Sequence, residues 1–108
     1  MQEKMNADFN YTQEKNTIAL LGRLIDYEQL ELLGKEIDAI VQNNEDVILD
    51  FKNLEYINST GLNFLVKSLT KIRNNGNELY IKNIPKSVKN LFIITKLNSI
   101  FNIIDHEA

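Results

Sequence analysis

Three short apolar segments, separated by stretches of helical periodicity, limit the folds open to this chain. They cover residues 17–22, 46–51 and 78–82, and each has the length of a buried β-strand. The stretches between them are long enough to cross from one strand to the next. Strands joined in this way become parallel neighbours with right-handed connections. The sequence therefore predicts an α/β domain with a mixed, mostly parallel sheet of about four to five strands packed with three or more helices.

The first crossover, residues 26–43, is predicted to form an amphipathic helix. Its apolar residues fall on one face: Leu30, Leu33, Ile37, Ile40 and Val41. Asp26, followed three residues later by Gln29, resembles a capping box at the start of this helix. Asp26 is therefore interpreted first as a helix cap and second as a functional acid.

The second crossover is predicted to be a helix from Thr60 onward. Its apolar face consists of Leu62, Leu65, Val66, Leu69 and Ile72. Residues 52–58, between the central strand and this helix, are interpreted as a connection.

Residues 8–12 should form a hairpin with the strand at 17–22, Pro85 should open a third helix, and residues 100–104 should form a last short strand.

Composition favours one cytoplasmic domain covering residues 1–108. The 108 residues are 44% apolar, but no apolar run reaches the roughly 18 residues that a membrane span requires. The N-terminus lacks the apolar region of a secretory signal. Cysteine is absent and the one histidine, His106, lies in the tail, so no metal site is expected. A net charge of −3 argues against a nucleic-acid partner.

Residues 58–61, Asn-Ser-Thr-Gly, carry the candidate functional side chains. They follow the central strand and open a helix, and in open α/β sheets sites gather at such carboxyl ends. The Ser59 or Thr60 hydroxyl could cap the helix. A serine nucleophile would need an adjacent base, and Ile57 stands where the G-x-S-x-G elbow needs glycine. The scattered glycines form no phosphate-binding loop.

Phosphorylation is the remaining interpretation of this hydroxyl pair. Free N–H groups and the helix dipole at a helix N-terminus favour an anion, so a phosphate there would not unfold the helix. It would add about −1.5 to −2 charges to a surface that a partner could read. The local residues alone leave capping, catalysis and modification open.

Three segments resemble the STAS domains of bacterial anti-sigma factor antagonists. Residues 47–66, VILDFKNLEYINSTGLNFLV, are similar to the family's buried strand, loop and Asp-Ser-[Ser/Thr/Ala]-Gly-Leu motif. Residues 20–33, LLGRLIDYEQLELL, resemble its Gly-Glu-Leu-Asp turn and first helix. Residues 87–104, SVKNLFIITKLNSIFNII, resemble its late Val-x-x-Leu-Phe and Leu-x-x-Ile-Phe-x-Ile segments.

The resemblance implies a non-enzymatic switch without a cofactor of its own. In such families the unphosphorylated antagonist binds an anti-sigma factor serine kinase and thereby frees the sigma factor. The kinase then phosphorylates the serine of the motif, here Ser59, and a serine phosphatase resets it. The resemblance also suggests partner-binding residues: Asp26, Asn58, Thr60, Gly61, Leu62 and Phe64. A STAS accessory subunit of a lipid or anion transport complex and a small α/β serine hydrolase are the alternatives.

Two departures set this chain apart within that resemblance, and Phe64 has two possible interpretations. Asn58 replaces the usual Asp, which removes a charge beside Ser59 and keeps the transport alternative open. Arg23 and Ile25 replace acidic residues of the family's turn. Phe64 lies off the apolar face of its helix, so it is either a contact exposed beside Ser59 or buried against the next strand.

Overall fold

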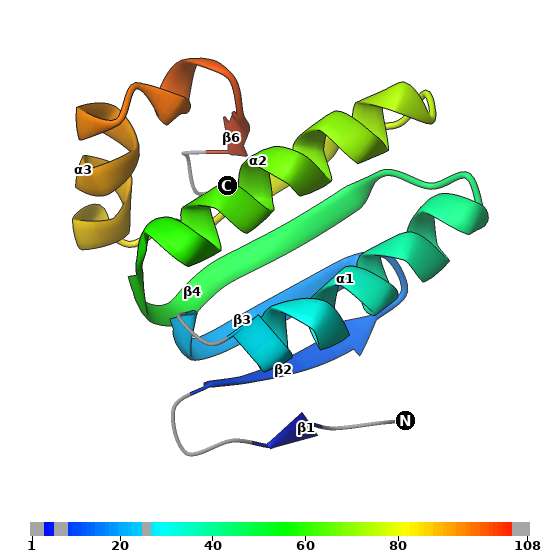
Figure 1. Cartoon of the computed structure of the whole chain (residues 1–108), viewed down its shortest axis with the longest axis horizontal. Helices are drawn as coiled ribbons and strands as arrows, with labels where there is room; N and C mark the ends of the chain where they lie inside the picture. Colours follow the sequence, from blue (N-terminus) through cyan, green and yellow to red (C-terminus); the bar gives the residue numbers. More distant parts are fainter. Residues whose placement is uncertain (1–3, 6–8, 25–26, 105–108) are drawn as a thin grey trace.

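The computed structural model describes residues 4–5, 9–24 and 27–104. These residues form one six-stranded sheet, three α-helices and a short 3₁₀ helix (Figure 1). In chain order the elements are β1 (Lys4–Met5), β2 (Phe9–Glu14), β3 (Thr17–Leu24), α1 (Tyr27–Gln42), β4 (Val47–Ile57), α2 (Ser59–Asn74), β5 (Leu79–Lys82), α3 (Lys86–Ile94), η1 (Leu97–Ser99) and β6 (Asn102–Ile104). The predicted hairpin, third helix and last strand are all present.

The sheet follows the order of the chain from β1 to β6. β1, β2 and β3 pair antiparallel, whereas β3, β4, β5 and β6 pair in parallel. The predicted α/β class, with a mixed and mostly parallel sheet, is confirmed; the two-residue β1 brings the number of strands to six. Asp26, the predicted helix cap, lies outside the described residues.

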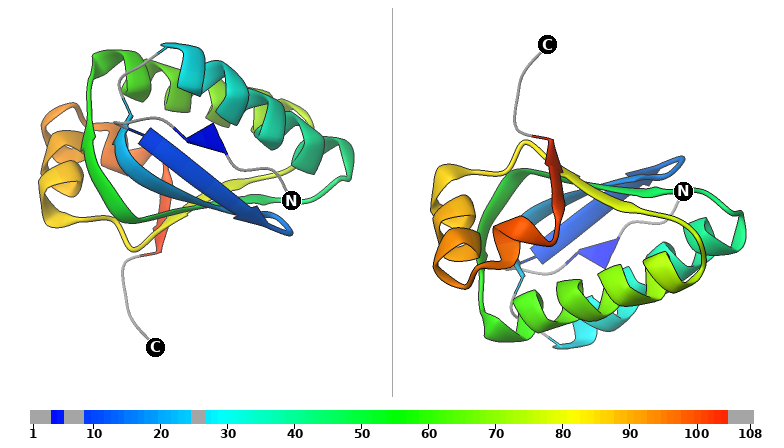
Figure 2. Two further views of the ribbon diagram at one scale, coloured as in Figure 1. Left: turned by 90° about the horizontal axis from the view of Figure 1, so that it is seen from below. Right: turned by 90° about the horizontal axis from the view of Figure 1, so that it is seen from above.

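The helices α1 and α2 lie side by side over one face of the sheet, and α3 lies at the end where α2 begins (Figure 2). Alternate residues of the central strands are buried beneath them: Ile18, Leu20, Val47, Leu49, Leu79 and Ile81. The apolar faces predicted for the helices supply the other half of the core, including Leu33, Ile37, Leu65 and Ile72. Burial of these faces, rather than helix propensity, is what holds a helical layer on a sheet.

The strand β4 is longer than the sequence predicts. The interpretation of residues 52–58 as a connection is wrong, because β4 pairs with β3 as far as Ile57. The register shifts twice, between Ala19 and Leu21 and between Gly22 and Arg23. At each shift β4 contributes one residue more than β3, as in a β-bulge, and Gly22 takes a φ of 91°.

These two bulges change the spacing of buried residues in β4. The buried side chains in its second half, Phe51, Leu54 and Ile57, lie three residues apart instead of two. The strand thus keeps one face on the core up to Ile57 and delivers the chain directly to the start of α2.

None of the helices in the described part of the chain has the length and apolar character needed to cross a membrane.

Candidate functional site

Asn58 forms the cap of α2. Its backbone is extended, with φ −105° and ψ −174°, and its side-chain Oδ1 accepts a hydrogen bond from the Gly61 N–H at 2.9 Å. Its carbonyl oxygen accepts one from the Leu62 N–H, also at 2.9 Å. Asparagine is among the residues that best satisfy the free N–H groups of a helix start. The interpretation of the Ser59 or Thr60 hydroxyl as the cap is therefore wrong.

Because Asn58 serves as the cap, the hydroxyls of Ser59 and Thr60 are not needed to cap the helix. Both residues are exposed and occupy the first two positions of α2. Within the described residues, neither their hydroxyls nor their backbone N–H groups have a hydrogen-bond partner. Within the described part of the chain, two hydroxyls and two N–H donors are thus left without a partner at the positive end of the helix dipole.

Gly61 anchors the first turn of α2 to the sheet. A Cβ at this position would lie 2.6 Å from the Leu24 carbonyl oxygen and 2.7 Å from Ile57 Cγ1. Only glycine allows the helix to approach the ends of β3 and β4 this closely. Gly61 and Leu62, two of the predicted partner-binding residues, are buried, although Leu62 also lines the groove described below. Ser59 and Thr60 contribute to the surface.

A groove between α2 and the segment after α3, here the α2–α3 groove, lies directly beside Ser59. Its volume is about 510 Å³, and its lining consists of Ser59, Thr60, Leu62, Asn63, Val66, Thr95 and Leu97. Two large apolar side chains of α3 immediately precede this lining: Ile93 is 48% exposed and Ile94 is 76% exposed. The candidate hydroxyl therefore borders a groove of mixed character, whose apolar residues are Leu62, Val66 and Leu97.

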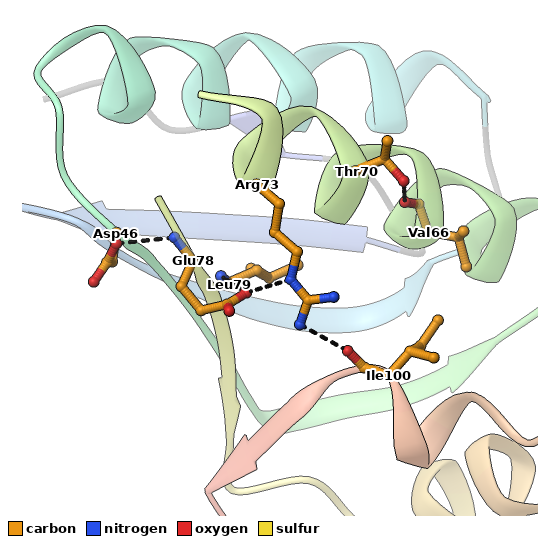
Figure 3. Close-up of polar contacts among 7 residues, drawn as sticks. All are labelled: Asp46, Val66, Thr70, Arg73, Glu78, Leu79 and Ile100. Atoms are coloured by element: carbon orange, nitrogen blue, oxygen red, sulfur yellow. Dashed lines mark hydrogen bonds and ion pairs between the residues drawn. The ribbon is translucent and has the colours of Figure 1, made fainter. Parts of the chain in front are cut away.

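Arg73 ties the segment after η1 to α2. Its Nη2 donates to the Ile100 carbonyl at 2.9 Å, and its Nε pairs with Glu78 Oε1 at 2.8 Å (Figure 3). The Glu78 N–H in turn donates to Asp46 Oδ1 at 2.9 Å. Burial raises the pKa of Glu78, but the hydrogen bonds from Arg73 and Leu79 outweigh it, and the net pKa lies below its usual value.

A second groove, here the α1–α2 groove, runs between the two helices that cover the sheet. Its volume is about 410 Å³. It is lined by Tyr27, Leu30, Glu31, Gly34, Lys35 and Asp38 from α1 and by Thr60, Asn63, Phe64 and Lys67 from α2. Phe64 is half-buried and its ring faces α1, since a Cβ on Gly34 would lie 3.5 Å from its Cε1 atom. Thr60 lines both grooves, so both open beside the start of α2.

Gly34 is unusual within α1. A glycine in a helix interior costs about 1 kcal/mol relative to alanine. Here an alanine Cβ would make only ordinary contacts with the Phe64 ring, at 3.5 and 3.8 Å, and no left-handed backbone is required. Neither packing nor backbone geometry explains the glycine; its effect is to deepen the groove. Gly34 is not among the site residues predicted from the sequence, although a glycine inside a helical pattern is itself a signal.

The carboxyl ends of β3 and β4 carry a cation on an aromatic ring. The Arg23 guanidinium carbon lies 5.0 Å from the centroid of the Tyr56 ring, and both residues are exposed. Arg23 thus presents a positive charge where the resemblance stated from the sequence led us to expect an acid. Ile25 lies outside the described residues.

The fold is an α/β domain with α1 and α2 on one face of the sheet. At the start of α2, capped by Asn58, it exposes two hydroxyl groups, those of Ser59 and Thr60. The family model described as "STAS domain" matches residues 10–108. The chain therefore belongs to the STAS domain family.

Several proteins similar to this chain are named anti-sigma factor antagonists. The anti-sigma-B factor antagonist of Bacillus subtilis (strain 168) is 26% identical over 100 residues, which cover 92% of each chain. The anti-sigma factor antagonist SpoIIAA in its unphosphorylated form has a TM-score of 0.68 at 16% identity, covering 92% of this chain and 88% of its own. Bacillus SpoIIAA in the phosphorylated form has a TM-score of 0.64 at 14% identity, covering 92% and 91%. At these identities the structures establish the shared fold alone.

Proposed function

We propose that this protein is an anti-sigma factor antagonist that acts by partner switching and has no catalytic activity of its own. Its unphosphorylated form binds an anti-sigma factor serine kinase in the cytoplasm and so releases a sigma factor. Phosphorylation of Ser59 ends the binding, and a serine phosphatase restores it. The names of its relatives support this role, as does a structural neighbour that carries the name of a phosphorylated antagonist.

The observation that carries the proposal is the division of roles at the start of α2. Asn58 caps the helix, so the exposed Ser59 hydroxyl makes no hydrogen bond within the described residues. A phosphate on Ser59 would find the free N–H groups of Ser59 and Thr60 and the positive end of the dipole. It would add about −1.5 to −2 charges without breaking a hydrogen bond on which the fold depends.

The apolar border of the site supplies a reason for the loss of binding. Ser59 shares the α2–α3 groove with Leu62, Val66 and Leu97. A partner that covers this surface would strip water from a doubly charged phosphate, and burying a charge without a partner is strongly unfavourable. The same modification is thus tolerated by the free protein and opposed in the complex.

The test is phosphorylation by the anti-sigma factor kinase of the same cell with ATP, followed by intact mass and peptide mapping. One phosphate on Ser59, absent in Ser59→Ala and retained in Thr60→Ala, is the expected result. Ser59→Asp should fold normally and bind the kinase much more weakly than wild type. No phosphate from an active kinase, together with stable copurification with an ATPase or permease, would instead favour the transport-accessory role to which the neutral Asn58 points.

A further inference from the structure

We propose that the α1–α2 groove is the docking site for one apolar side chain of the kinase, carried next to a carboxylate. The inference rests on the proposed function, because it names the surface that the partner of Ser59 uses. Its evidence is the shape of the groove, its position relative to Ser59 and the charges on its rim.

The shape of the groove depends on Gly34. An alanine at this position would be more favourable for the helix and would clash with nothing, yet its methyl group would reach 3.5 Å from the Phe64 ring and fill the floor. The floor left open by the glycine consists of Gly34, Leu30 and Phe64. An apolar side chain from outside could bury itself there against both helices.

The groove lies within the area that a bound kinase must cover. A typical interface buries about 800 Å² on each partner, which is a disc of about 16 Å radius. Phe64 follows Ser59 by five residues in α2, which is about 7.5 Å along the helix axis at about 1.5 Å per residue. Thr60 lines both grooves. A kinase centred on Ser59 therefore reaches the α1–α2 groove without any change in fold.

The rim of the groove identifies the chemistry of the partner. Tyr27, 72% exposed, stands at the end of the groove that Thr60 also lines and offers an aromatic contact. Lys35 and Lys67 flank the groove on opposite helices, and neither forms an ion pair within the described residues. Asp38, in contrast, is already engaged by Lys71 at 2.7 Å. Glu31 also lines the groove and forms no ion pair within the described residues, so two unpaired lysines face one unpaired carboxylate. The net positive rim beside an apolar floor is complementary to an apolar residue flanked by a carboxylate.

The decisive variant is Gly34→Ala, because it should separate stability from binding. It fills the floor, so we expect the affinity for the kinase to fall at least tenfold while the thermal midpoint rises. Ala39→Gly is the matched control: Ala39 is exposed on the same helix and lies outside the groove lining. This reverse substitution should lower the thermal midpoint and leave the affinity unchanged.

Tyr27→Ala and Lys67→Glu test the rim without disturbing the core. Each should weaken binding about fivefold, and the effect of Lys67→Glu should shrink as salt is added. If Gly34→Ala, Tyr27→Ala and Lys67→Glu all bind as tightly as wild type while Ser59 is still phosphorylated, the docking site is refuted and the proposed function stands. If wild type itself neither binds the kinase nor accepts phosphate, both proposals fall together.

Discussion

The substitution Gly61→Ala should destabilise the protein although the same substitution at Gly34 should stabilise it. At Gly61 the new methyl group would lie 2.6 Å from the Leu24 carbonyl oxygen and 2.7 Å from Ile57 Cγ1. The carbonyl belongs to the end of β3 and cannot rotate away as a side chain could. The first turn of α2 must therefore move off the sheet, or β3 and β4 must give way.

The size of the effect follows from two opposing contributions. Overpacking in a tight core costs up to about 3 kcal/mol, and replacing a helical glycine with alanine returns about 1 kcal/mol. The net loss of stability at Gly61 is then up to about 2 kcal/mol. With an m-value of about 2 kcal/mol per molar urea, the unfolding midpoint should fall by up to about 1 M. Gly34→Ala should raise the same midpoint by about 0.5 M.

Urea unfolding followed by far-UV circular dichroism measures all three proteins under one condition. The opposite signs of the two variants are the test, because helix propensity alone predicts that both are stabilised. A Gly61→Ala protein with a midpoint equal to or above that of wild type would show that α2 does not rest on the strand ends as described. The account of Gly61 would then have to be abandoned.

Three further predictions concern the cap and two titrating groups. Asn58→Ala should lose about 1 kcal/mol of stability through the lost cap, whereas Asn58→Asp should keep wild-type stability at pH 7, both measured by urea unfolding. Because folding lowers the pKa of Glu78, the contribution of this residue to the free energy of unfolding is fully present above pH 4.5, its ordinary pKa. That contribution is lost as pH falls through the folded-state pKa. The unfolding midpoint should therefore decline less steeply in acid for Glu78→Gln than for wild type. Burial, then the charge of Glu36 and a 3.4 Å hydrogen bond to it, raise the pKa of Tyr11 above its ordinary value of 10.0. Its contribution should be complete below pH 10.0 and lost as pH rises through the folded-state pKa; the difference in phenolate absorbance between wild type and Tyr11→Phe measures that titration.

The parts of the fold predicted correctly are those whose signal is local. The apolar periods of α1 and α2 match their buried faces, and the short apolar run in residues 46–51 matches the first half of β4, although only alternate residues there are fully buried. The second half of β4 was missed because its buried residues, Phe51, Leu54 and Ile57, are spaced by three. That spacing fits neither the period of two of a strand nor the 3.6 of a helix. It arises from bulges against β3, which depend on the partner strand.

The cap and the grooves were hidden for a similar reason. Three consecutive residues, Asn58, Ser59 and Thr60, are all good caps, and the sequence offers no means to choose among them. The choice is made where β4 ends at Ile57, because Asn58 is then the first residue free to leave the sheet. The α1–α2 groove likewise depends on which faces of two helices meet. In the sequence, only Gly34, a glycine within a helical pattern, indicates this groove.

The structure separates the residues that hold the start of α2 from those that a partner can reach. Asn58 and Gly61 make the contacts that fix the helix, whereas the Ser59 and Thr60 hydroxyls make no hydrogen bond within the described residues. On the proposed mechanism, this separation lets one hydroxyl change its charge while the fold stays constant. Substitutions at Asn58 or Gly61 should then alter stability first, and substitutions at Ser59 should alter binding alone. A Ser59→Ala protein destabilised as strongly as Gly61→Ala would contradict this division.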